Sequence, residues 1–204
     1  MARITSPICK KCRREGRKLF LKGERCFSPK CPFTRRSYPP GERKNMRIRL
    51  TEYGQQLREK QKAKAIYGVL EKQFHRYYEQ SRKGKDDKSI LGFVERRLDN
   101  VVYRLGFASS RRQARQMITH NHFLVNEGKV NIPSYQIKIG DKVTFRNKDS
   151  KFIKNIKNNQ KRNNPVSWLR YDADKVMGEV TSFPQKEDLG EDIEERLIIE
   201  FYSR

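Results

Sequence analysis

Four cysteines near the amino terminus constrain this chain more than any other feature. They are Cys9, Cys12, Cys26 and Cys31, and they form two close pairs with two and four intervening residues. Two such pairs allow four thiolates to converge at about 2.3 Å on one tetrahedral ion, the geometry of a structural zinc site. Because four protein ligands leave no open position for a substrate, we expect one zinc ion per chain that orders the fold and takes no part in catalysis.

Other interpretations of the cysteines stay open. Two disulfides would need an oxidising compartment, yet the start of the chain has no apolar run that could serve as a signal peptide. Four unrelated reduced thiols would not explain the paired spacing. Zinc is favoured over an iron–sulfur cluster because nothing else suggests redox chemistry, although the spacing alone does not exclude iron. Reduced thiols predict a cytoplasmic location.

The charge of the chain is large and unevenly distributed. The 204 residues carry a formal charge of +23. Residues 1–50 contain sixteen Lys or Arg and three acids, whereas residues 171–204 contain four basic and ten acidic residues. Such a one-sided positive field predicts a polyanionic partner, and nucleic acid is favoured. A membrane surface is disfavoured because the chain lacks a clear amphipathic anchor and any apolar stretch near the roughly 20 residues of a membrane-spanning helix.

The first half of the chain predicts an irregular segment followed by helix. Residues 1–45 are basic, contain proline and are poor in core residues, so we expect zinc and a partner to order them rather than burial. A helical period then runs over 51–81, with Thr51 as a cap. Gly54 and Gly68 weaken it, which leaves one helix or two open.

The second half predicts a helix–turn–helix followed by strands. Ser110 with Gln113 three residues later forms a capping box that opens the second of the two helices. Strand periods then cover 123–126, 129–132 and 142–145, with further apolar stretches at 166–169 and 196–202. The first helix spans 89–106, from Ser89 as N-cap to Gly106 as C-cap. Its apolar stripe consists of Leu91, Val94, Leu98, Val101, Val102 and Leu105. The second helix is expected to bury Ala114, Met117 and Ile118.

These patterns predict an α+β fold. An irregular zinc-bound N-terminal segment (1–45) is joined to a helical domain (46–93), and a small helix–turn–helix and β-sheet RNA-binding domain (94–189) follows, with its core module at 94–158. We expect the C-terminal residues 190–204 to pack back on the helical domain.

Candidate phosphate-binding residues fall in two groups. Arg111, Arg112 and Arg115 lie beside the start of a capped helix, where backbone amides and guanidinium groups suit phosphate oxygens. A surface helix with merely solvated arginines is the alternative. The second group consists of basic residues of the first fifty: Lys10, Arg13, Arg14, Arg35, Arg36, Lys44, Arg47 and Arg49.

One stretch resembles a known RNA-binding module. Residues 95–116, with the continuation at 124–126 and 132–135, are similar to the module named for small-subunit ribosomal protein four. This module also occurs in pseudouridine synthases and in a tyrosyl-tRNA synthetase. By itself the resemblance therefore implies RNA binding and not a ribosome.

Further stretches make the resemblance more specific. Residues 19–26, 38–41, 53–61, 67–74 and 197–204 resemble the bacterial small-subunit ribosomal protein four family, in its zinc-binding four-cysteine form. The likeness covers essentially the full length. It departs at His120-Asn121-His122, where the family usually has His-Gly-His, and at 125–128, where Glu127 displaces the usual turn glycine by one position. After Gly41 the chain also lacks the family's Gln-His-Gly but stays basic.

The resemblance implies a structural ribosomal protein. It would bind small-subunit ribosomal RNA directly in the cytoplasmic small ribosomal subunit, nucleate assembly of the subunit body and contribute to translational accuracy. Its partners would include neighbouring small-subunit proteins, especially protein five. They would also include messenger RNA near the messenger entry channel of the subunit.

Parts of the sequence would also suit other functions. An RNA-binding translational repressor acting off the ribosome would use the same module, and a zinc DNA-binding regulator could place the helix–turn–helix in a major groove. An RNA-modifying enzyme would need a catalytic domain. The sequence offers neither a Cys–His pair outside the metal site nor a phosphate-cradling glycine loop, so we expect no enzymatic activity.

Overall fold

The computed structural model describes residues 4–41, 49–83, 89–147, 166–172, 175–185, 188 and 193–204. The chain forms two compact units, one of Met1–Ile90 with Glu191–Arg204 and one of Leu91–Gly190. Within the described ranges, no helix is both long and apolar enough to cross a membrane. Lys44, Arg47 and the end of the predicted core module at 148–158 lie outside the described residues.

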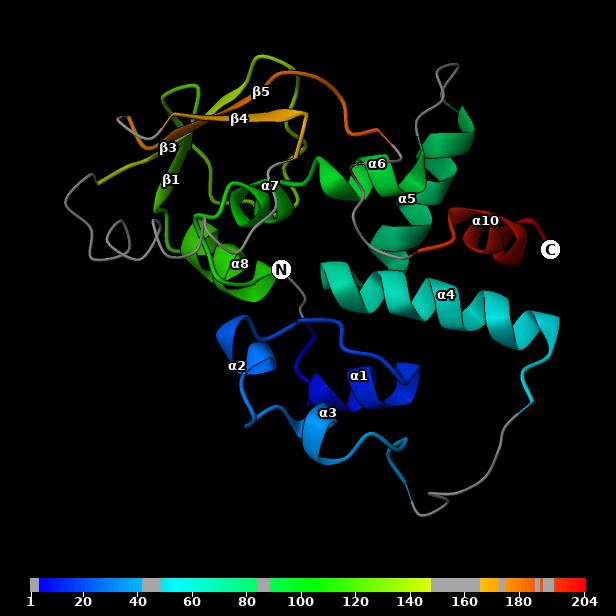
Figure 1. Ribbon diagram of the computed structural model, residues 1–204. Coiled ribbons are helices and arrows are strands. Elements are labelled where there is room, and N and C mark those ends of the chain that lie inside the picture. The colour runs from blue at the N-terminus through cyan, green and yellow to red at the C-terminus, as the bar shows by residue number, and fades with distance from the viewer. Residues whose placement is uncertain are drawn as a thin grey trace. The chain divides into compact units, whose positions relative to one another are not determined.

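The N-terminal segment is helical rather than irregular. Helix α1 (Cys9–Glu15) ends where Gly16 takes the left-handed conformation, at φ 66°. Ile8, Leu19 and Leu21 are buried together with three of the cysteines. The expectation that burial contributes nothing here is therefore wrong: closely spaced apolar residues and thiols form a small core. The helices are α1 (Cys9–Glu15), α2 (Glu24–Phe27) and α3 (Pro32–Arg35) (Figure 1).

Two helices, not one, follow in the first unit. They are α4 (Glu52–Tyr67) and α5 (Glu71–Lys83). Thr51 caps α4 as predicted, because its side-chain oxygen accepts a 3.2 Å hydrogen bond from the Gly54 N–H. Gly68 has a φ of 67° and ends the helix, since a left-handed residue breaks the α conformation and glycine adopts it without strain.

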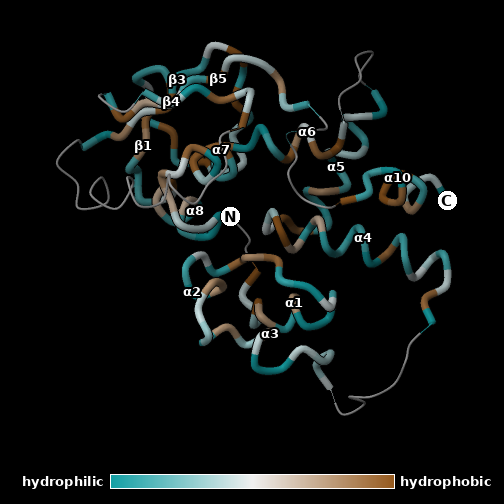
Figure 2. The backbone as a smooth tube through the Cα atoms, in the orientation of Figure 1, coloured by the Kyte–Doolittle hydropathy of each residue, from teal (hydrophilic) through white to brown (hydrophobic). Residues whose placement is uncertain are grey.

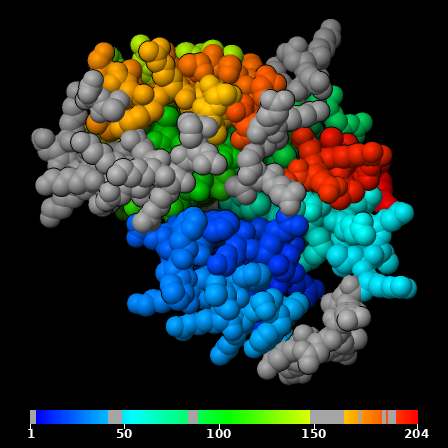
Figure 3. All heavy atoms as spheres, in the orientation of Figure 1, coloured from blue at the N-terminus to red at the C-terminus, as the bar shows by residue number. Residues whose placement is uncertain are grey.

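The C-terminal stretch is a helix and not a strand. Helix α10 (Glu195–Ser203) packs against α4, and the two lie side by side in Figures 1 and 3. The Tyr202 hydroxyl donates a 2.6 Å hydrogen bond to Glu71, whose carboxylate also pairs with Lys60 at 3.0 Å. The Lys60 ammonium lies 3.9 Å from the centre of the Phe201 ring. These contacts with α4 and α5 favour the helix over the β-propensity of its Ile and Tyr residues.

The helix predicted over 89–106 is interrupted. Helix α6 (Ile90–Glu95) and α7 (Leu98–Arg104) are separated because Arg97 has an extended conformation, with φ −66° and ψ 138°. There Arg97 forms an antiparallel bridge with Gln136. A continuous apolar stripe does not reveal this break, since the residues that cause it lie about forty positions further along the chain.

The second unit is completed by α8 (Arg111–Thr119) and an antiparallel sheet. Among the described strands the order is β2-β1-β3-β5-β4. Val125 pairs with Gly128 across the first hairpin and with Val143 of β3. The strands are β1 (Phe123–Val125), β2 (Gly128–Lys129), β3 (Lys142–Phe145), β4 (Leu169–Asp172) and β5 (Met177–Val180).

The core of this unit lies between the helices and the sheet. Leu98 and Val102 of α7, Ile118 of α8 and Phe123 of β1 are fully buried in one cluster. Figure 2 shows the hydrophobic stretches of α7 and β1. The packing is close: a Cβ at Gly178 of β5 would come within 2.2 Å of the Leu105 side chain. The predicted buried face of α8, Ala114, Met117 and Ile118, is confirmed.

The first hairpin has a two-residue turn. Asn126 and Glu127 both have positive φ angles, 47° and 65°, as a type I′ turn requires. The predicted strand periods at 123–126 and 129–132 leave a Glu-Gly turn at 127–128. That turn is wrong by one residue, because Gly128 is already part of β2 and pairs with Val125. The turn places Glu127 in a left-handed conformation that favours glycine.

Candidate nucleic-acid interface

The four cysteines converge on one small cavity. Cys9 and Cys12 lie on α1, Cys26 lies on α2, and Cys31 immediately precedes α3. All four line a cavity of about 10 Å³, together with apolar side chains that include Ile8 and Leu21. None forms a disulfide, and all but Cys9 are buried. The three short helices therefore bring together residues that are 22 positions apart in the sequence.

The electrostatics of this cavity differ from one thiol to another. Burial raises the pKa of Cys12 and of Cys26, and the neighbouring sulfurs raise both further. Burial also opposes ionisation of Cys31, but hydrogen bonds from Thr34 and Phe33 lower its pKa. The Cys26 sulfur accepts a 3.3 Å hydrogen bond from the Lys22 N–H. In the part of the chain that the structure describes, no three His, Cys, Asp or Glu side chains are grouped as metal ligands.

One of the predicted RNA-binding arginines of this segment has an internal role. Arg13 donates hydrogen bonds to the carbonyl oxygens of Tyr38 at 2.9 Å and Pro39 at 3.3 Å. Its guanidinium also lies 4.9 Å from the centre of the Tyr38 ring. Arg13 therefore holds the Tyr-Pro-Pro stretch against α1. Five other predicted RNA-binding residues are exposed, namely Lys10, Arg14, Arg35, Arg36 and Arg49.

The start of α8 is capped largely as predicted. The Ser110 hydroxyl oxygen accepts a 3.3 Å hydrogen bond from the Gln113 N–H. The reciprocal bond goes to a different residue, because the Gln113 side-chain oxygen accepts from the N–H of Ser109 at 2.8 Å and from its hydroxyl at 2.6 Å. The capping box is therefore displaced by one residue at its return bond, and Arg111 and Arg112 occupy the first turn of a well-fixed helix.

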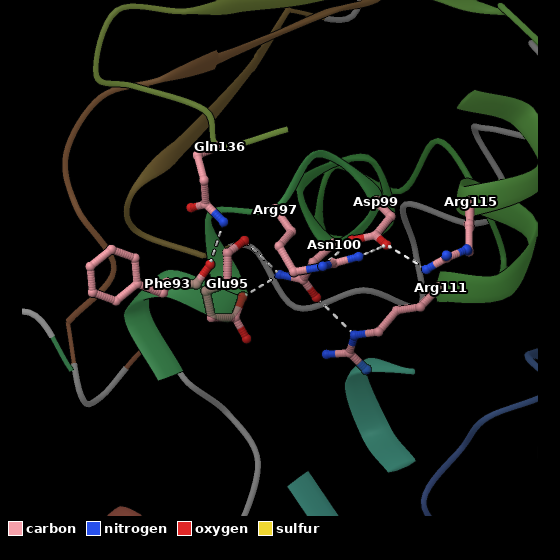
Figure 4. A network of polar contacts seen from close by, with 8 residues as sticks. All are labelled: Phe93, Glu95, Arg97, Asp99, Asn100, Arg111, Arg115 and Gln136. Carbon is pink, nitrogen blue, oxygen red and sulfur yellow. Dashed lines mark hydrogen bonds and ion pairs between the residues drawn. The ribbon is translucent and has the colours of Figure 1, made fainter. Parts of the chain in front are cut away.

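Arg111 is bound to a buried polar network, which Figure 4 shows. Its Nε donates a 2.8 Å hydrogen bond to the side-chain oxygen of Asn100, and its guanidinium lies 4.6 Å from the centre of the Tyr103 ring. Asn100 in turn donates to the backbone oxygen of Glu95 at 2.9 Å and to its carboxylate at 2.6 Å. Asn100 and Glu95 are 1% and 0% exposed. A chain of hydrogen bonds thus connects the core to the guanidinium of Arg111.

The buried carboxylates of this network are paired with arginines. Arg104 forms two hydrogen bonds with Glu95, at 2.7 and 3.1 Å. Arg97 forms a fork with Asp99, of which the Nε–Oδ1 bond measures 3.0 Å. Arg115 lies 3.7 Å from the same carboxylate. Loss of an arginine from one of these pairs would leave a buried carboxylate unpaired and strongly destabilise the fold. The folded state therefore keeps the arginine side chains in these positions.

Sequence reasoning missed Glu95, Asp99 and Asn100 as part of the site. Helical periodicity gave no signal for Asp99 and Asn100, because one continuous helix over 89–106 would place both away from the apolar stripe, whereas they are buried in the structure, where the helix is broken at Arg97. Arg111 and Arg115 are also not merely solvated, the alternative that the sequence left open, because both contact buried side chains. Arg112 is exposed. The role of all three toward RNA stays a prediction.

Comparison with known proteins identifies the family. The family model for the ribosomal protein S4/S9 N-terminal domain matches residues 3–95, and the S4 domain matches residues 96–143. The small ribosomal subunit protein uS4 of Halothermothrix orenii is 51% identical over 208 aligned residues that cover both chains completely. The uS4 proteins of Caldicellulosiruptor bescii and Pelotomaculum thermopropionicum are 51% and 48% identical with the same coverage. This chain belongs to the uS4 family.

Membership in the uS4 family agrees with the resemblance seen in the sequence motifs, which is confirmed at the level of the family. The boundary between the two matched domains, at 95 and 96, lies next to the buried network, and Glu95 is the last residue of α6. The S4 domain contains α7, α8, β1 and β2 and the start of β3. In this uS4 chain the zinc ion stays a prediction.

Proposed function

We propose that this chain is a structural protein of the cytoplasmic small ribosomal subunit, that it binds small-subunit ribosomal RNA directly, and that it is not an enzyme. The observation that carries this proposal is identity of 51% to a uS4 protein over the whole of both chains. The charge of +23 supports it, because so large a positive charge suits a polyanion.

The chemistry of binding follows from the second unit. The capped start of α8 presents backbone amides and a positive helix end, and Arg111, Arg112 and Arg115 lie on its first turns. The buried network fixes the orientation of Arg111 and Arg115, so these two groups lose little conformational entropy when they contact phosphate. Contacts of this kind position a protein on the shape of folded RNA and do not read its linear sequence.

Finer aspects of the function are proposed from the family resemblance. The protein would nucleate assembly of the subunit body and contribute to translational accuracy. It would neighbour other small-subunit proteins, protein five above all, and messenger RNA near the channel through which it enters.

Chemical footprinting of small-subunit ribosomal RNA with the purified full-length protein tests the central proposal. We expect one compact set of protected nucleotides at a one-to-one ratio, and retention of the protein on small subunits during sedimentation at high salt. Uniform weak protection, or equal competition by duplex DNA, would favour the DNA-binding regulator instead. A protein found only outside the subunit fraction would favour the off-ribosome repressor.

We propose further that Cys9, Cys12, Cys26 and Cys31 bind one zinc ion. Two observations support this: the four thiols line one cavity, and none is used in a disulfide. Four sulfur donors are the ligand set of a structural zinc site. A bound cation would also stabilise the thiolates, which burial at Cys12 and Cys26 disfavours. When bound, the ion would hold α1, α2 and α3 together.

Elemental analysis of protein purified without added metal tests the zinc proposal. We expect close to one equivalent of zinc and thiols that react slowly with Ellman's reagent until a chelator is added. Cys26→Ser should lose the metal and lower the thermal stability of the first unit, while the second unit stays folded because its core is separate. Metal-free protein with four freely reacting thiols would contradict the proposal.

A further inference from the structure

Two phenylalanine rings are stacked on the surface of the N-terminal segment. Phe20 lies in the loop between α1 and α2, and Phe27 is the last residue of α2. Their ring centres are 4.9 Å apart and their planes differ by 27°. The rings are 44% and 65% exposed. Because the two rings are in contact, they form an exposed apolar patch, which is more informative than a single exposed apolar side chain.

The chain turns these rings outward although it buries their neighbours. Leu19 and Leu21, on either side of Phe20, are 5% and 9% exposed, and Cys26, before Phe27, is 7% exposed. The small core of the segment is therefore made by other residues. The two phenylalanine rings do not belong to that core, and they form a separate exposed pair.

The backbone at Phe20 is strained in order to hold this arrangement. Phe20 has a φ of 47°, in the left-handed region that a bulky side chain rarely adopts. Such strain persists where the surrounding structure imposes it, and it is frequent at binding sites. The strain gives a second observation, independent of exposure, that the outward ring has a use.

The charge of the segment indicates what the rings contact. Between residues 17 and 36 there is one acidic residue, Glu24, against seven basic ones: Arg17, Lys18, Lys22, Arg25, Lys30, Arg35 and Arg36. All of these basic side chains except Lys18 are exposed. Stacking rings combined with a strongly basic surface are the features by which proteins bind unpaired nucleotides, the rings contacting bases and the cations contacting phosphates.

We propose that Phe20 and Phe27 form a stacking site for an unpaired base of the small-subunit ribosomal RNA. This rests on the proposed function and adds to it a contact in the first unit that is distinct from the arginines of α8. The outer face of the stacked pair takes the base. The exposed cations of the same segment, Lys22 and Arg25 among them, bind the flanking phosphates.

Filter binding of full-length variants to small-subunit ribosomal RNA, at several salt concentrations, tests the proposal. Phe20→Ala with Phe27→Ala should weaken binding by about 5- to 150-fold, the range found for one stacked base. The slope of log affinity against log salt should not change, because no charge is removed. The matched control, Lys22→Ala with Arg25→Ala, removes two cations and should therefore reduce the magnitude of that slope by about 1.5.

Three further variants separate stacking from other causes. Phe20→Tyr with Phe27→Tyr keeps both rings and should bind like the parent, whereas Phe20→Leu with Phe27→Leu keeps apolar area without an aromatic face and should bind as weakly as the alanine variant. Phe20→Gly relieves the backbone strain, so it should melt no lower than the parent and yet bind more weakly. Weak binding together with retained stability excludes misfolding as the cause.

The possible results distinguish this inference from the proposed function. If the parent does not bind the RNA, the proposed function fails. If the parent binds and the alanine variant binds equally well, only the stacking site is wrong. Parent-like binding by the leucine variant would show that apolar area, and not an aromatic face, contacts the RNA. Normal RNA affinity of the alanine variant with loss of incorporation into subunits would assign the rings to a protein neighbour. Either result would overturn the inference.

Discussion

The Nε of Arg111 donates a 2.8 Å hydrogen bond to the side-chain oxygen of Asn100, a residue that is 1% exposed. An arginine on the first turn of α8 is therefore linked to a buried amide of α7. Because the same Asn100 side chain donates to Glu95, its amide is fully directed by its neighbours. The proposed RNA contact of Arg111 is consequently linked, through Asn100, to the stability of the second unit.

Asn100→Ala should destabilise the second unit. It removes the donor to Glu95 and the acceptor for Arg111, so buried polar groups lose partners at a cost of about 2–4 kcal/mol. Denaturant unfolding of the variant and parent measures this. The control is Arg112→Ala, an exposed residue of the same helix start, which should change stability by less than about 0.5 kcal/mol. Equal effects of the two changes would contradict the importance of the network.

Replacing Arg111 and Arg115 together by Ala should weaken both RNA binding and folding. We expect a loss of about 2–4 kcal/mol in binding, from two charge-assisted contacts. We also expect about 1–2 kcal/mol less stability, because Arg111 loses its bond to Asn100 and Asp99 loses a nearby cation. RNA affinity measured well below both melting temperatures separates the two effects. A folded double variant with parental affinity would show that this face does not bind RNA.

Glu127→Gly should stabilise the first hairpin. Glu127 has a φ of 65°, where a side chain costs about 1–2 kcal/mol and glycine costs nothing. Glycine loses more entropy on folding, by about 0.5–1 kcal/mol, so a net gain of about 0.5–1 kcal/mol is expected. Thermal unfolding measures it. Glu127→Ala keeps a Cβ at the same angle and should give no such gain, and a gain as large as that of glycine would rule out strain as the cause.

The first unit should lose stability in acid, because protonation of Glu71 removes the charge that its partners stabilise. Burial opposes its ionisation, but hydrogen bonds from Lys64, Tyr202 and Lys60 lower its pKa to about 2. Because this folded value lies below the unfolded value of about 4.3, its contribution to stability is complete above roughly pH 4.5 and disappears as the pH falls through about 2.

Glu71→Gln tests this contribution across the pH range. The carboxylate is 47% exposed, so solvent screening limits the loss at pH 7 to about 0.5–1.5 kcal/mol. Urea unfolding between pH 2 and pH 7 should give curves for parent and variant that converge in acid. The control Glu79→Gln, on the same helix and half exposed, should change stability by less than about 0.5 kcal/mol at any pH. A gap for Glu71→Gln that stays constant down to pH 2 would contradict the account.

Local signals in the sequence predicted several elements of this fold correctly. Thr51 and Ser110 cap α4 and α8 because a side-chain oxygen three residues before a backbone N–H is within reach by local geometry alone. The buried face of α8 follows from helical periodicity. The family follows from motifs spread over the whole chain. Both the matching family models and the full-length relatives support it.

Features that depend on distant residues were not predictable. The break at Arg97 requires its bridge to Gln136, and the helical C-terminus requires contacts of Tyr202 with Glu71. The site was incomplete for the same reason. Arg111 was predicted as a candidate from its place at the start of a helix, but its fixed orientation depends on Asn100 and Glu95, whose positions follow from the break between α6 and α7.

The salt dependence of binding to small-subunit ribosomal RNA tests the central claim most directly. The affinity of the full-length protein should fall linearly with salt on a logarithmic plot, with a slope of several units, because its cations replace many counterions on the RNA. At each salt concentration it should bind this RNA more tightly than an unrelated folded RNA of equal length, since shape contributes as well as charge. A flat salt response, or equal affinity for both RNAs, would contradict the account.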